Sequence, residues 1–313
     1  MINVKFAFVF PGQGSQSVGM MQGFGGSAEV RGVFDEASDA LKQDMWKLAE
    51  QGPAEELNST VNTQPLMLTA GYAVYRAWKA AGGPDPALVA GHSLGEYTAL
   101  VASGALAFRD ALPLVRFRAQ AMQEAVPVGE GAMAAMLGLE DDALRAACSE
   151  AARGQVVEPV NFNAPGQVVI AGSKAAVERA VEAAKAKGAK RAIMLPVSAP
   201  FHSSLLKPAA TRLEQYLAGV SFASPRIPVI NNVDVEIETD GQRIRHALAR
   251  QACSPVRWVE VIRRMHAAGV EHVAECGPGR VLAGLTRRIE GRVQGYAIAD
   301  TPSLEKTLEA LRV

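Results

Sequence analysis

The residues best suited to chemistry lie in a glycine-flanked turn around Ser93. An apolar run over residues 87–91 is typical of a buried strand, Gly91-His92-Ser93-Leu94-Gly95 follows, and a helical pattern begins at Glu96. Between a strand and a helix, G-x-S-x-G describes a sharp turn that points a strained serine hydroxyl outward. The helix N-terminus favours negative charge developing beside that hydroxyl. The motif therefore predicts a nucleophile, and a serine that only caps the helix is the alternative.

A serine hydroxyl needs a base within hydrogen-bond reach, and the chain has five histidines. His202 is the best candidate, because the loop Ser198-Ala199-Pro200-Phe201-His202 stands at a predicted junction between domains, where sites assemble. His92 is adjacent to Ser93, so we expect its ring to point away from the hydroxyl and brace the turn. The remaining three stand in helical or strand-entry segments where half-buried or solvated histidines are common: His246, His266 and His272.

A hydrolase triad would add an acid between the serine and the histidine in chain order. Asp141, Asp142 and Glu150 fall in that interval, but the pattern of their predicted helix explains them as capping and solvent-facing residues. No acid stands out, and a backbone carbonyl or an amide could orient His202 instead. The residues thus predict a dyad rather than a triad.

Strand-like and helical runs alternate along the chain that must hold these residues. The pattern predicts strands at 6–10, 87–91, 227–231 and 272–275, and helices at 30–50, 64–81, from 96, and at 204–217, 243–252 and 281–289. That order is typical of βαβ units around a mostly parallel sheet.

The order of predicted strands and helices changes near residue 128. From there we expect strands at 132–139, 156–161, 167–171 and 191–197, with helices at 141–152 and 174–187. This β-α-β-β-α-β order is that of a ferredoxin-like unit. The prediction is an α/β fold: an α/β-hydrolase-like large domain, residues 1–128 and 199–313, with a ferredoxin-like small domain inserted at 129–198.

Composition excludes several classes of protein. Lysine plus arginine and aspartate plus glutamate each number 32 in 313 residues, so no net field attracts nucleic acid or a membrane surface. The apolar start ends at Pro11-Gly12 without a cleavage pattern, and no run approaches the roughly 20 residues that span a bilayer. Three distant cysteines without a CxxC pair predict a cytoplasmic protein with no disulfide or metal site, and the lack of a nucleotide-binding motif predicts no cofactor. We expect a monomer.

With further motifs added, the chain resembles the malonyl-CoA:acyl carrier protein transacylases nearly end to end. The resemblance is carried by the turn around Ser93, by the loop of His202, and by residues 10–16, 64–65, 116–122, 161–167, 255–258 and 275–279. It implies the fold described above, with a ferredoxin-like insertion, and an enzyme that transfers malonyl from coenzyme A to an acyl carrier protein.

The resemblance also implies roles for individual residues. Ser93 is the acylated nucleophile and His202 its base, and the carbonyl of Gln251 holds the second nitrogen of His202. The main-chain amides of Gln13 and Leu94 form the oxyanion hole. Further residues are expected around the substrate: Arg118, Gln13, Asn161, Asn163, Phe201 and His92.

Arg118 is the residue expected to select the acyl group. Arg116 and Arg118 are two apart on a predicted helix, so they point to different sides, and a surface arginine is the alternative. A carboxylate taken out of water needs a paired cation, and a guanidinium holds it in two places. Leu94 and Phe201 resemble the malonyl-selective members, whereas Ala119 departs from the glycine that the family often has there.

The expected reaction is ping-pong transfer through a malonyl-serine, with malonyl-CoA and an acyl carrier protein as partners. A thioesterase or esterase using the same turn is a second hypothesis, and it differs only in its acceptor. A carrier-binding scaffold without activity is a third, which the presence of both Ser93 and His202 disfavours. Fatty acid and polyketide synthesis both remain open as destinations.

Overall fold

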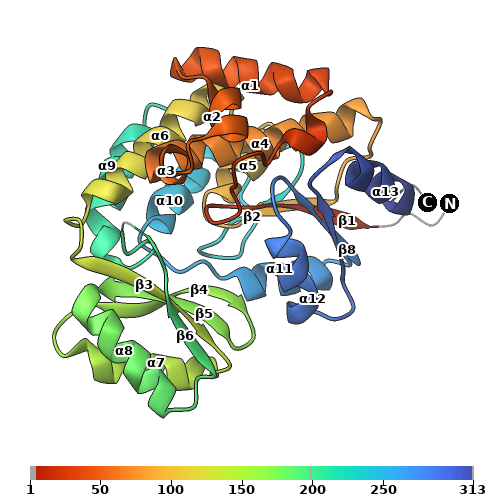
Figure 1. The fold of residues 1–313 in the computed structure, drawn as a ribbon. Coiled ribbons are helices and arrows are strands. Elements are labelled where there is room, and N and C mark those ends of the chain that lie inside the picture. Colours follow the sequence, from red (N-terminus) through yellow and green to blue (C-terminus); the bar gives the residue numbers. More distant parts are fainter. Residues whose placement is uncertain (1–4, 198, 312–313) are drawn as a thin grey trace.

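Two β-sheets organise the chain (Figure 1). The computed structural model describes residues 5–197 and 199–311. The larger sheet has five parallel strands in the order β7 (Val229–Ile230), β2 (Leu88–Gly91), β1 (Phe6–Phe10), β8 (His272–Cys276) and β9 (Gln294–Ile298). The smaller sheet has four antiparallel strands in the order β4 (Val157–Ala164), β5 (Gln167–Ser173), β3 (Gly131–Leu137) and β6 (Arg191–Met194).

Helices cover both faces of the larger sheet, as parallel sheets require. Side chains alternate along β1, so Phe6, Phe8 and Phe10 face one core and Ala7 and Val9 face another. The first core is shared with α1 (Ala28–Leu41), α4 (Thr60–Ala80) and α6 (Phe108–Glu124), and the second with α11 (Trp258–Ala267) and α12 (Val281–Ile289).

The other helices of this part pack on the first core. They are η1 (Gln22–Phe24), α2 (Met45–Gln51), α3 (Ala54–Asn58), α5 (Gly95–Ala102), η2 (Ser204–Leu206), α9 (Lys207–Leu217), α10 (Gly241–Gln251) and α13 (Thr301–Leu311). Within residues 5–197 and 199–311, no helix combines the length and the apolarity that crossing a membrane requires.

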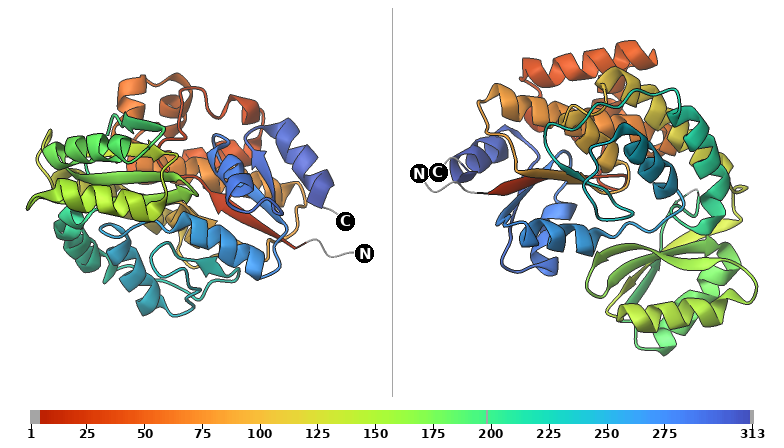
Figure 2. Two further views of the ribbon diagram at one scale, coloured as in Figure 1. Left: turned by 90° about the horizontal axis from the view of Figure 1, so that it is seen from below. Right: turned by 180° about the vertical axis from the view of Figure 1, so that it is seen from behind.

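The smaller sheet and its two helices form one end of the molecule (Figure 2). The helices α7 (Asp141–Ala152) and α8 (Lys174–Ala186) share a core with one face of this sheet. Its other face contributes Met133, Val160 and Val169 to the core of the larger part. The predicted β-α-β-β-α-β order and the α/β fold class are confirmed. The domain boundaries at 128/129 and 198/199 stay a prediction, and residue 198 lies outside the described residues.

Three predicted strands or helices have different bounds in the structure. Helix α4 begins at Thr60 rather than at Gln64, so that Pro65 lies inside the helix. Strand β6 ends at Met194 rather than at residue 197, just before Leu195-Pro196. Strand β7 keeps only Val229 and Ile230 of the predicted run 227–231, since Pro228 has no N–H to donate to a ladder.

Other departures concern elements that the sequence did not predict or did not divide correctly. The predicted helix at 204–217 begins as the 3-10 turn η2, and the helical run at 30–50 is split between α1 and α2. Five elements were missed: η1, α3, α11, β9 and α13, and the helix predicted from residue 96 is divided into α5 and α6. Strand β9 is an edge strand that is partly exposed and contains Gly295, which weakens its apolar signal.

Two glycines allow the strand β2 to turn sharply into α5. A Cβ atom added to Gly91 would lie 1.8 Å from the carbonyl carbon of Gly95. One added to Gly95 would lie 2.0 Å from the carbonyl oxygen of Phe10. Both neighbours are backbone atoms, so side-chain rearrangement cannot make room. The turn therefore needs glycine at both positions.

We predict that Gly91→Ala and Gly95→Ala each destabilise the fold by at least about 3 kcal/mol, because the added methyl overlaps backbone. Gly32→Ala is the matched control: Gly32 is exposed on α1 with open space around its Cα. That change should stabilise the protein by about 0.5–1 kcal/mol. Urea unfolding measures both effects. A Gly91→Ala or Gly95→Ala variant as stable as Gly32→Ala would contradict the close backbone contacts at the turn.

Candidate active site

Ser93 lies at the turn between β2 and α5 in a strained backbone conformation. Its φ is +52°, in the left-handed region that non-glycine residues rarely adopt. The side chain of Asn232 holds this turn from outside. Ser93 N–H donates to Asn232 Oδ1 at 2.7 Å, and Asn232 Nδ2 donates to the carbonyl of Gly91 at 2.8 Å. The amide thus ties the residues on both sides of His92.

His202 reaches the nucleophile from a loop 109 residues further along the chain. Its Nε2 lies 2.7 Å from Ser93 Oγ, and its Nδ1 lies 2.8 Å from the carbonyl oxygen of Gln251. A carbonyl only accepts, so Nδ1 carries the hydrogen and donates it, which leaves Nε2 free to accept from the serine hydroxyl. The expected contact with Gln251 is present, and its catalytic role stays a prediction.

The environment of His202 keeps its imidazole neutral. Burial, together with the nearby positive charge of Arg118, lowers the pKa of His202 from 6.5 to about 3, against the opposing hydrogen bond to Gln251. A neutral imidazole is the form that accepts a proton. The imidazole of His202 is therefore in the form that can accept a proton at neutral pH, as its predicted role as base requires.

Arg118 is buried beside Ser93 and has only uncharged hydrogen-bond acceptors. Its guanidinium donates to Gln64 Oε1 at 2.7 Å, to Gln251 Oε1 at 2.9 Å and to Ser93 Oγ at 3.1 Å. Arg118 is 1% exposed, and its Nε is buried without a partner in the described part of the chain. A buried cation with neutral partners favours a ligand that brings a negative charge.

Two main-chain amides near Ser93 suit an oxyanion. Leu94 immediately precedes α5, and the N–H groups of Leu94 and Gln13 donate to no acceptor within the described ranges. Gly12 lets the loop that follows β1 pack against the turn at Ser93, since a Cβ at Gly12 would lie 2.5 Å from the carbonyl oxygen of His92. The side chain of Gln13 points elsewhere and donates to Thr60 Oγ1 at 3.3 Å. Only the main chain of Gln13 is therefore suited to the predicted role.

The small sheet contributes residues that meet the turn on its other side. His92 Nε2 lies 2.8 Å from Asn163 Oδ1, and its ring packs against Trp258. The bracing role predicted for His92 agrees with these contacts. Asn161 is buried next to Val256, but its Oδ1 has no partner among the described residues. Phe201 is buried in the main core next to His202. Contact of these residues with substrate stays a prediction.

Three polar residues of this cluster were not assigned a role from the sequence. Gln64 belongs to one of the motifs that carry the resemblance, whereas Glu96 and Asn232 have no predicted role, and all three make hydrogen bonds in this cluster. Two features of the sequence could have indicated a role for Glu96 and Asn232. Glu96 is the one charged residue of helix α5, and Asn232 closely follows β7 at the carboxyl edge of the sheet. That edge is where open α/β sheets place their ligand sites.

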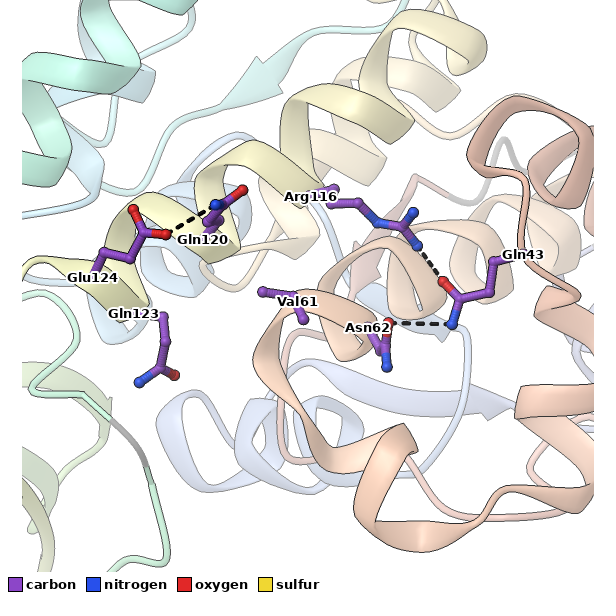
Figure 3. Close-up of a pocket in the computed structure, with 7 residues that line it drawn as sticks. All are labelled: Gln43, Val61, Asn62, Arg116, Gln120, Gln123 and Glu124. Carbon is purple, nitrogen blue, oxygen red and sulfur yellow. Dashed lines mark hydrogen bonds between the residues drawn. The ribbon is translucent and has the colours of Figure 1, made fainter. Parts of the chain in front are cut away.

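One cavity has a lining that includes neither Ser93 nor His202. It has a volume of about 520 Å³ and lies between α4 and α6, lined by Gln43, Val61, Asn62, Arg116, Gln120, Gln123 and Glu124 (Figure 3). Arg116 donates there to Gln43 and to the carbonyl of Leu41, away from Arg118. The two arginines point to different sides of α6, as predicted.

The arrangement supports acyl transfer through a serine ester. A neutral imidazole contacts the Ser93 hydroxyl, and the buried guanidinium of Arg118 lies 3.1 Å from the same oxygen. The main-chain amides of Leu94 and Gln13, which donate to no acceptor within the described ranges, belong to the same turn and to the loop packed against it. In the described ranges, no group of three or more His, Cys, Asp or Glu side chains could hold a metal ion.

Comparison with known proteins agrees with this chemistry. Residues 7–294 match the model of the acyl transferase domain family. The chain is 56% identical to a malonyl CoA-acyl carrier protein transacylase of Escherichia coli strain K12, covering 97% of this chain and 99% of that protein.

Solved structures show the same similarity. A crystal structure of an acyl-carrier-protein S-malonyltransferase from Burkholderia pseudomallei 1710b is 65% identical, with a TM-score of 0.97 over 98% of this chain and 100% of that one. A malonyl-transacylase solved in complex with a type II PKS acyl-carrier protein is 53% identical, with a TM-score of 0.97 over 98% and 99%.

We predict that acylation of Ser93 by a thioester is independent of pH between about pH 5 and about pH 8, because a base whose pKa is lowered from 6.5 to about 3 stays unprotonated there. Rapid-quench intact mass spectrometry measures the rate of ester formation. A tenfold loss of rate for each pH unit below about 6.5 would show an ordinary imidazole instead.

Proposed function

The chain belongs to the malonyl-CoA:acyl carrier protein transacylases of the acyl transferase family and transfers malonyl from coenzyme A to an acyl carrier protein, and we propose that Ser93 carries the group between the two thiols. The observation that carries this proposal is the 2.7 Å contact between Ser93 Oγ and His202 Nε2, beside the guanidinium of Arg118. The product serves fatty acid or polyketide synthesis.

The first half-reaction forms an ester on Ser93. His202 Nε2 takes the hydroxyl proton as Oγ attacks the malonyl thioester carbonyl. The main-chain amides of Gln13 and Leu94 hold the resulting oxyanion, and each such donor is worth about 3 kcal/mol in the transition state. When the intermediate collapses, the C–S bond breaks and the coenzyme A sulfur takes the proton from His202.

The second half-reaction reverses these steps with a new thiol. The phosphopantetheine thiol of the carrier gives its proton to His202 and attacks the malonyl ester, and the C–O bond to Ser93 breaks as the proton returns to Oγ. Hydrolysis of the malonyl ester by water must be slower than attack by this thiol. His202 and Arg118, at 4% and 1% exposed, leave little room for water beside the ester.

Arg118 selects malonyl over uncharged acyl groups in this proposal. Its present partners Gln64 and Gln251 are neutral, so the malonyl carboxylate brings the first directly bonded negative charge. An acetyl group would leave the buried guanidinium without that partner.

We further infer that residues 129–198 form a unit inserted between 1–128 and 199–313, because the four-stranded sheet has its own core with α7 and α8. Asn161 and Asn163 then line the acyl group from this unit. We place the reaction in the cytoplasm, where the unpaired thiols of Cys148, Cys253 and Cys276 remain reduced. One chain supplies the whole Ser93 cluster, so a monomer is sufficient for activity.

Ser93→Ala is predicted to abolish covalent labelling by malonyl-CoA, because the variant has no hydroxyl to esterify. Intact mass spectrometry detects the label, and stoichiometric labelling of the variant would contradict the proposal. With wild-type protein and acyl carrier protein present, malonyl-carrier should form in excess over free malonate. The reverse ratio would make the protein a thioesterase.

Arg118→Ala is predicted to slow malonyl transfer by about tenfold to a hundredfold while acetyl transfer changes far less, since a charge-assisted contact to the carboxylate is lost. Arg116→Ala is the matched control, because Arg116 lies on the same helix and points to the other side. Steady-state kcat/KM with both thioesters measures the effect. Equal losses for malonyl and acetyl would remove the proposed role of Arg118.

A further inference from the structure

Glu96 is a carboxylate buried directly behind the nucleophile. It lies in the first turn of α5, where all eight residues are buried, and is itself 2% exposed. Burying a carboxylate is costly unless hydrogen bonds compensate. Nothing in the transfer chemistry described above uses this residue.

One oxygen of Glu96 joins two segments that are distant in sequence. Oε2 accepts from the main-chain N–H of Asn232 at 2.9 Å and from Gln251 Nε2 at 2.8 Å. These two residues stand 136 and 155 positions beyond Glu96. The carboxylate therefore fixes the positions of the loop at Asn232 and of the end of α10 at Gln251 relative to the turn at Ser93.

Gln251 connects Glu96 to the reacting groups. Its Oε1 accepts from Arg118 at 2.9 Å, and its Nε2 donates to the carbonyl of Ser93 at 3.0 Å as well as to Glu96. The main-chain carbonyl of the same residue accepts from His202 Nδ1 at 2.8 Å. One residue thus orients both the selecting cation and the base.

The carboxylate sets which way the Gln251 amide points. If this amide were flipped, its oxygen would face the carboxylate of Glu96 and its NH2 group would face the guanidinium of Arg118, so both contacts would become repulsive. An acceptor at position 96 excludes that arrangement. The amide oxygen is therefore held toward Arg118.

Asn232 gives Glu96 a second path to the nucleophile. Its main-chain N–H is fixed by Glu96 Oε2, and its side chain donates to Gly91 and accepts from Ser93 N–H. These bonds brace the strained φ of Ser93.

We propose that Glu96 is a positioning residue for malonyl transfer: through Gln251 and Asn232 it orients Arg118, His202 and Ser93 without touching the substrate. The inference rests on the proposed function of this site. It extends the group of residues that determine acyl selectivity to one that does not contact the acyl group.

The role requires an acceptor oxygen rather than a charge. Both bonds go to the same oxygen, which a glutamine side chain also provides. Burial raises the pKa of Glu96 to about 7, against the opposing bonds from Gln251 and Asn232 and the charge of Arg118. Protonation of the other oxygen leaves the network intact.

Three variants separate positioning from simple stability. Glu96→Met keeps the volume and removes the acceptor, whereas Glu96→Gln keeps one acceptor oxygen and removes the charge. Leu100→Ala is the matched control, since Leu100 lies one turn further along α5, is equally buried and lines the same small cavity as Glu96. Single-turnover ester formation with malonyl-CoA and with acetyl-CoA gives the rate ratio for each folded protein.

We expect Glu96→Met to lower the malonyl rate by at least about tenfold and to lower the malonyl-to-acetyl ratio, because the hold on Arg118 is lost. Glu96→Gln should restore most of the wild-type ratio. Leu100→Ala should lower Tm while leaving the ratio unchanged.

An unchanged ratio in folded Glu96→Met would overturn the proposal, as would equal losses of the malonyl and acetyl rates. If Glu96→Met does not fold, Gln251→Met tests the same path while keeping the main-chain carbonyl, and it must lower the ratio too. Failure of the wild-type protein to form any ester would instead refute the proposed function.

Discussion

The proposed chemistry requires the hydrogen bond between Ser93 Oγ and His202 Nε2. This bond joins a strained turn to a loop from a distant part of the chain, and both residues adopt positive φ values. Such conformations persist only where the surroundings hold them. Here the carbonyl of Gln251 accepts from the imidazole and the side chain of Asn232 accepts from the N–H of Ser93, so the ring is oriented without the acid that a triad has.

Neutral groups separate the charges of this site. Arg118 and Glu96 are both buried, and the amide of Gln251 lies between them with its oxygen toward the cation and its nitrogen toward the carboxylate. A direct ion pair would have satisfied Arg118 fully and left it less available to a substrate carboxylate. The amide orients the guanidinium while leaving its charge unneutralised by direct contact, which suits a site that must take in an anion.

Helices, strands and turns that depend on neighbouring residues could be predicted from the sequence, whereas contacts between distant residues could not. Helix α7 and the turn at Ser93 follow from periodicity, glycine and capping signals within a few residues. His202 could be favoured from its place at a domain junction, but its contact with the Gln251 carbonyl came only from family resemblance. Glu96 and Asn232 were missed because their role exists only once β7 pairs with β2, which no local pattern specifies.

The tautomer of His202 decides whether a base faces Ser93, because proton abstraction at Nε2 requires a neutral ring with its hydrogen on Nδ1. Nitrogen-15 NMR of histidine-labelled protein at about pH 7 distinguishes the two neutral tautomers and the imidazolium. The His202 signals are assigned by comparison with a His202→Asn variant. We expect a protonated Nδ1 bonded to the carbonyl of Gln251 and an unprotonated Nε2 facing Ser93. A protonated Nε2, in either the other tautomer or the imidazolium, would contradict this expectation, because no base would then face the hydroxyl.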